Sequence, residues 1–220
     1  MRSAVWCRGL PVLVALAMTL GLADRTAIAQ GGAPSRTLPS RLEPGTRTAI
    51  QALADSLAAT GLPAAAIYDK AAEGVLKGAD DARILVVVRV LAQRLREART
   101  LLGAGAGADD LTAGASALAA GLTSDQVQRV ARARERRPTE VTLAAVLSVL
   151  SDLVAQRVPG ALATSSVEML LDRGARDVDL TSFRAGVMQD ILAGQRPGEA
   201  TSSRVQSALR ALDARRPPDR

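Results

Sequence analysis

The sequence contains no histidine, and its single cysteine, Cys7, stands close to the N-terminus. Histidine is the usual general base near neutral pH and the commonest metal ligand, so its absence disfavours both kinds of site. Aromatic residues make up 1% of the chain, and only two lysines, Lys70 and Lys77, accompany the arginines. No Gly-x-Ser-x-Gly, phosphate-loop or dinucleotide-binding motif occurs. These absences disfavour an enzyme and predict no metal and no cofactor.

The first 29 residues have the features of an export signal. Arg2 and Arg8 give a positive start, residues 10–23 form an apolar run, and small residues at 27 and 29 precede Gln30. The run of about fourteen residues is shorter than the roughly twenty that span a bilayer. We therefore expect a signal peptide over residues 1–29 and a mature protein in the periplasm or outside the cell, not embedded in the membrane.

The positive charge is modest and spread along the chain. The net charge is +6, and residues 1–29 hold three arginines and one aspartate, so their removal lowers it to +4. This excess is too small and too dispersed to indicate a nucleic-acid-binding surface. The expected partner is a protein or an anionic component of the cell envelope, and no nucleic acid.

Alanine, leucine and valine supply most of the apolar residues after the signal, which favours helices over strands. The pattern predicts an all-α fold of about eight helices, arranged as stacked helical hairpins (a small repeat array) or as an irregular bundle. The clearest helix covers residues 81–102, with Asp80 or Asp81 as its N-cap. Its expected buried stripe is Ile84, Val87, Val88, Leu91, Leu95, Ala98 and Leu102.

Further helix starts are predicted from capping signals. Thr123 and Gln126 have the spacing of a capping box. Residues 138–140 (Pro-Thr-Glu) and 165–168 (Ser-Ser-Val-Glu) are two more expected starts, and Gly174 is expected to end the second of these helices.

The layout of the chain follows from these signals. A flexible leader is expected over residues 30–45, an all-helical domain over 46–213 and a charged tail over 214–220. Glycine and alanine alternate over residues 103–108, which predicts a flexible connection inside the domain. Residues 149–155 and 187–193 are similar and both precede a Pro-Gly pair, which indicates an internal repeat with Asp152 and Asp190 at equivalent positions. A hydrogen bond across the hairpin is the role expected for both aspartates.

A resemblance to known proteins rests on residues 70–78 (KAAEGVLKG), on Arg83-Ile84 and on residues 92–95 (AQRL). This stretch of about forty residues resembles exported helical proteins of GC-rich bacteria whose activity is uncharacterised. The resemblance implies a helical fold and export, and it implies no activity.

The candidate reactive groups have structural explanations. Lys70, Glu73 and Lys77 have the spacing of an ion-pair ladder on a helix surface. Asp109 is expected to cap a helix whose dipole favours Asp110 beside it. A hydrolase that uses two carboxylates alone stays open, because acids from distant helices can meet in the fold.

The densest run of charge is arginine-rich. Arg129, Arg132 and Arg136 share one helical face, with Arg134 and Arg137 close by. After export these cations can contact lipid head groups, acidic polymers or a partner's acidic face, or they can form a solvated helix end. We therefore expect an exported, non-catalytic structural or protein-interaction module. The alternatives are a peripheral binder of anionic envelope surface and a carboxylate-only hydrolase.

Overall fold

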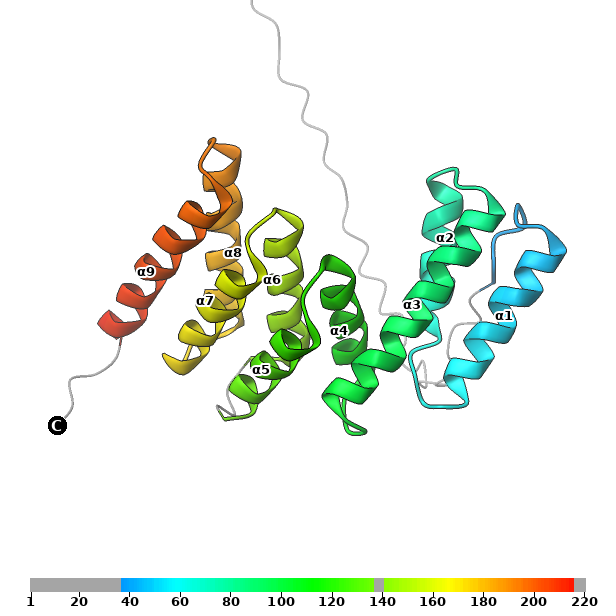
Figure 1. Cartoon of the computed structure of the whole chain (residues 1–220), viewed down its shortest axis with the longest axis horizontal. Helices are drawn as coiled ribbons and strands as arrows, with labels where there is room; N and C mark the ends of the chain where they lie inside the picture. The colour runs from blue at the N-terminus through cyan, green and yellow to red at the C-terminus, as the bar shows by residue number, and fades with distance from the viewer. Residues whose placement is uncertain (1–36, 137–140, 216–220) are drawn as a thin grey trace, which may run out of the picture. The chain divides into compact units, whose positions relative to one another are not determined.

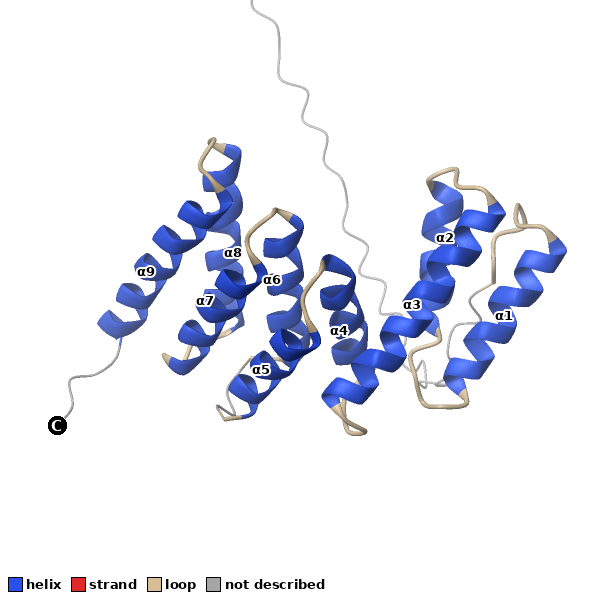
Figure 2. Ribbon diagram, viewed as in Figure 1, coloured by secondary structure: helices blue, strands red, loops and turns tan. Residues whose placement is uncertain are grey.

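A computed structural model describes residues 37–136 and 141–215 of the chain. These residues form helices joined by short loops and contain no strand, so the all-α prediction is confirmed (Figures 1 and 2). The helices of this part of the chain are α1 (Pro44–Ala58), α2 (Ala65–Leu76), α3 (Asp81–Leu102), α4 (Ala108–Ala120), α5 (Ser124–Glu135), α6 (Leu143–Ala155), α7 (Gly160–Asp172), α8 (Asp177–Leu192) and α9 (Pro197–Arg215).

From α4 onward, consecutive helices form hairpins that stack in two layers. The helices α4, α6 and α8 pack side by side in one layer. The helices α3, α5, α7 and α9 follow one another in the second layer. At the N-terminal end, α1 and α2 both pack on α3. Stacking of this kind buries apolar stripes that a single hairpin leaves open.

The core consists of two apolar clusters that share α4. Leu111 and Ala115 of this helix belong to the cluster built from α1, α2 and α3, whereas Ala117 and Leu118 belong to the cluster of α4 to α9. The close approach of the helices depends on small side chains. A Cβ on Gly114 would lie 3.1 Å from Leu102 Cδ1 and 3.2 Å from Ala98 Cβ on α3.

Several local predictions are confirmed. The side chain of Asp80 caps α3 by accepting a hydrogen bond from the backbone N–H of Arg83. Thr123 and Gln126 form the predicted capping box of α5. Gly174 follows the end of α7 with a φ of 79°, a left-handed conformation that glycine adopts without strain.

One predicted helix start and one predicted cap are wrong, and a second predicted start lies outside the described residues. Residues 165–168 lie in the middle of α7, which begins at Gly160, and Ser166 is fully buried there. Residues 138–140 lie outside the described part of the chain, and α6 begins at Leu143 with Thr142 as its N-cap. Asp109 does not cap α4: Gly107 takes that position, and Asp109 lies in the first turn, where the dipole still favours a carboxylate.

The terminal predictions fall largely outside the described residues. The signal peptide and residues 30–36 of the leader lie there, as do residues 216–220 of the tail. The described end of the leader makes fixed contacts with the helices: Leu42 is 2% exposed, and Arg41 Nη1 donates to the carbonyl of Val75 at 2.8 Å.

The Gly/Ala connection over residues 103–108 also contacts a helix: Arg99 Nη1 of α3 donates to the carbonyl of Ala104 at 2.5 Å.

The two similar segments hold equivalent places in the fold. Residues 149–155 form the second half of α6, and residues 187–193 cover the end of α8 and its C-cap. Asp190 pairs with Arg204 at 2.5 Å across the α8–α9 hairpin, as predicted, whereas Asp152 pairs with Arg184 on α8, the next helix of its layer. Whether the segments arose by duplication stays a prediction.

Candidate functional site

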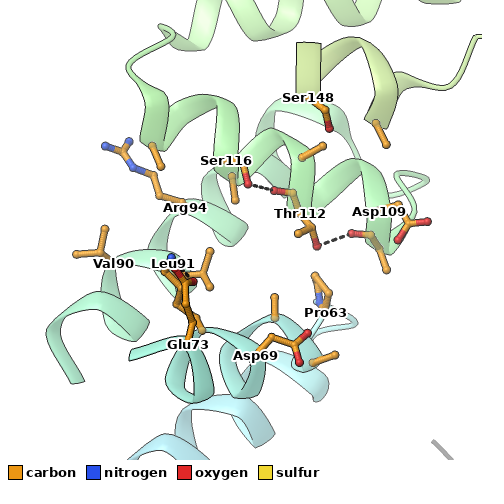
Figure 3. A pocket seen from close by; sticks show the side chains of 18 of the residues that line it. Pro63, Asp69, Glu73, Val90, Leu91, Arg94, Asp109, Thr112, Ser116 and Ser148 are labelled. Atoms are coloured by element: carbon orange, nitrogen blue, oxygen red, sulfur yellow. Dashed lines mark hydrogen bonds and ion pairs between the residues drawn. The ribbon is translucent and has the colours of Figure 1, made fainter. Parts of the chain in front are cut away.

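A groove of about 730 Å³ lies between α2 and α4. Residues of α2 and α4 form its two sides, residues of α3 form its floor, and Ala144 and Ser148 of α6 extend the α4 side (Figure 3). The first turns of α2 and α4 line the same groove, at Ala65 and Asp109. The groove exists because α2 packs on α3 without packing closely on α4.

The floor of the groove is aliphatic and partly open to solvent. Val87, Val90 and Leu91 line it. Val86 and Val90 are 59% and 52% exposed, and Val87 is 39% exposed, although the sequence pattern placed Val87 in the buried stripe. We call Val86, Val87 and Val90 the α3 valine strip. The sequence held a signal for it, since the run 84–88 together with Val90 has more apolar residues than one buried stripe can hold.

The α2 side of the groove carries the predicted ion-pair ladder, which is confirmed. Glu73 accepts from Lys70 Nζ at 2.7 Å and from Lys77 Nζ at 2.5 Å. These hydrogen bonds, with that from Lys70 the stronger, lower the pKa of Glu73 from 4.5 to about 2. Glu73 is therefore an ionised carboxylate at neutral pH, held between two ammonium groups.

The remaining polar residues of the groove are mostly engaged within the fold. Arg94 pairs with Glu97 at 3.0 Å. The hydroxyls of Thr112 and Ser116 donate to carbonyls of their own helix, one turn earlier. Among residues 37–136 and 141–215, no three His, Cys, Asp or Glu side chains gather into a metal-binding group. The groove thus combines an aliphatic floor with sides on which most polar groups already have partners within the fold.

The arginines of the predicted cluster fall into two groups: some are bonded within the fold, and others are exposed. Arg129 donates to Glu168 of α7 through Nε and Nη2, at 3.2 and 2.5 Å. Arg134 Nε donates to the carbonyl of Val141 at 3.0 Å. Arg132 and Arg136 are exposed, and neither has an ion pair within the described residues. Arg137 lies outside those residues. Two of the four described arginines therefore tie α5 to its neighbours.

Within the described ranges, no helix combines the length and the apolar character needed to cross a bilayer.

No family model, curated protein or solved structure matches this chain.

Proposed function

We propose that this chain is an exported, non-catalytic protein-interaction module whose docking surface is the groove between α2 and α4. The single observation that carries the proposal is the α3 valine strip on and beside the floor of that groove. Exposed aliphatic side chains that adjoin a groove are typical of a surface that another molecule covers. Stacked helices suit such a role, because they present extended faces.

The ionised state of Glu73 supports a role in contact in preference to a role as a general acid. A hydrolase with two carboxylates needs one of them to stay protonated near neutral pH, which requires a raised pKa. The pKa of Glu73 is lowered to about 2 by its two lysine partners, which is the opposite direction. A general acid at this position would have to lose both ion pairs first.

Binding of an anionic envelope surface through α5 is the weaker candidate. Its support is the exposure of Arg132 and Arg136. Two cations contribute about 1 kcal/mol each at a charged membrane surface, and an isolated pair of this kind gives only marginal attachment. Arg129 and Arg134 would have to leave Glu168 and the carbonyl of Val141 to take part.

Photo-crosslinking in the native cells tests the proposed surface. A photoreactive amino acid at Val90 is expected to give a covalent adduct with a protein, because that side chain lies in the docking surface. The matched control is the same amino acid at Arg89, which is also exposed on α3 but one position away around the helix. Equal adduct yields at Val90 and Arg89, or none at Val90, would refute the surface.

The same sample tests export. Mass spectrometry of the crosslinked protein from the cell envelope is expected to show an N-terminus at Gln30. A protein that keeps residues 1–29 and fractionates with the cytoplasm would contradict this part of the proposal, whatever the adduct.

A further inference from the structure

The α3 valine strip lies between two opposite charges on the same helix. Positions 83, 90 and 97 are seven residues apart and so share one face of α3. Arg83 and Glu97 occupy the ends of this face, about 21 Å apart at 1.5 Å per residue, and Val90 is its midpoint. Val86 lies on the same face, one turn before Val90.

We propose that the partner of this surface is a second copy of the chain, a step that rests on the proposed function. The arrangement is self-complementary: when two α3 helices lie antiparallel with a two-fold axis at Val90, each position 83 faces position 97 of the other copy. One rotation therefore forms two Arg83–Glu97 pairs and places the two Val90 side chains in contact. In a two-fold interface the same patch of both copies forms the contact, so each residue must suit the residue that the rotation places opposite it.

The charged ends are available for this pairing. Arg83 has no ion pair within the described residues, and its side chain is exposed. Glu97 is held in place by Arg94 at 3.0 Å on one carboxylate oxygen and by the Ser124 hydroxyl at 3.2 Å on the other. Each carboxylate oxygen accepts two hydrogen bonds, so Glu97 can accept from a further guanidinium.

The valines pack beside the stems of long side chains. The same two-fold rotation places Val86 opposite Arg94 of the other copy, because these positions lie four residues on either side of Val90. The methylene groups of an arginine cover apolar surface while its charged end stays in water. Aliphatic contact thus continues on both sides of the axis.

The size of the surface sets the expected strength. Stable dimers bury about 800 Å² on each partner, and three partly exposed valines with their neighbours supply less than that. The dimer is therefore weak and dissociates on dilution.

A single cysteine at the axis tests this arrangement. The protein is made with its own leader in a Cys7→Ser background, so Val90→Cys is the only cysteine whether or not residues 1–29 are removed. At a two-fold axis the two Cα atoms come within the about 4.4–6.8 Å that a disulfide needs. We expect Val90→Cys to form a disulfide-linked dimer at least about tenfold faster than Arg89→Cys under mild oxidation, since only the first lies on the axis.

Charge exchange tests the register by sedimentation equilibrium. Arg83→Glu places two carboxylates at each end of the interface and is expected to weaken the dimer about tenfold. The double variant R83E/E97R restores opposite charges and is expected to dimerise like the parent. Rescue by the double variant cannot come from general destabilisation, because it carries more changes than the single variant.

The outcomes separate this inference from the proposed function. A protein that stays monomeric at millimolar concentration, or cysteines at 89 and 90 that crosslink equally fast, would overturn the dimer. If Val90 then still crosslinks to a different protein in cells, the docking surface stands with another occupant. A dimer whose dissociation constant is the same with and without R83E would overturn the antiparallel register.

Discussion

Two buried hydroxyls of α7 lead us to predict that a substitution in the core raises the stability of the protein. Thr164 and Ser166 are fully buried, and neither hydroxyl has a hydrogen-bond partner within the described residues. A buried polar group without a partner costs about 1–3 kcal/mol. Thr164→Val keeps the shape of the side chain and replaces the hydroxyl by a methyl group. We therefore expect this variant to raise the free energy of unfolding by about 1–2 kcal/mol.

The structure supplies a matched control. Thr201 is also fully buried, but its hydroxyl donates to the carbonyl of Pro197 at 2.7 Å. Thr201→Val makes the same chemical change in another helix and loses that bond, so it is expected to cost about 0.5–1.5 kcal/mol. The helix-propensity difference between threonine and valine is common to both variants and cancels in the comparison.

Thermal unfolding followed by circular dichroism measures the contrast. For a domain of 150–250 residues, 1 kcal/mol shifts Tm by about 2–4 °C, so Thr164→Val should raise Tm by roughly 2–8 °C while Thr201→Val lowers it. Urea unfolding of both variants gives the free energies directly. If the two variants change stability by the same amount and in the same direction, the assignment of an unsatisfied hydroxyl at Thr164 is refuted.

Two further predictions concern the close packing at Gly114 and the dependence of stability on Asp179 at acid pH. Gly114→Val should lower the free energy of unfolding by about 1–3 kcal/mol in a urea titration, because Ala98 Cβ cannot move without α3; stability equal to the parent's would contradict this close approach. Burial raises the pKa of Asp179, but hydrogen bonds from the Arg176 backbone and from Arg215 outweigh it and lower that pKa below 3.8. The stability gained from Asp179 is thus present above pH 3.8 and is lost as the pH falls through the lowered value. Asp179→Asn should unfold with a shallower acid dependence below that pH, and an unchanged acid profile would argue against the pairing.

Much of the fold could be predicted because helix signals are local. The period of α3 and its Asp80 cap, and the capping box at Thr123, depend on residues within a few turns of one another. The false start at residues 165–168 has the same origin: hydroxyls followed by an acid are typical of a helix start, but burial of Ser166 is decided by neighbouring helices. Local chemistry does not carry that information.

The groove could not be predicted for the same reason. It depends on α2 and α4 both packing on α3 while leaving space between them, and the residues involved span 63 to 148. The sequence did hold part of the answer, since Val86 and Val90 fall outside the stripe that the core uses. The arginine cluster, in contrast, was conspicuous in the sequence, and the fold uses Arg129 and Arg134 for internal contacts.

The position of α4 has a consequence for how the chain can be divided. Its thirteen residues contribute to both apolar clusters, and the glycine-rich stretch before it resembles a natural linker. A cut between Leu102 and Ala108 would nevertheless remove Leu111 and Ala115 from the first cluster, leaving the N-terminal fragment with an open apolar face. The two apolar clusters are therefore interdependent, because both need residues of α4.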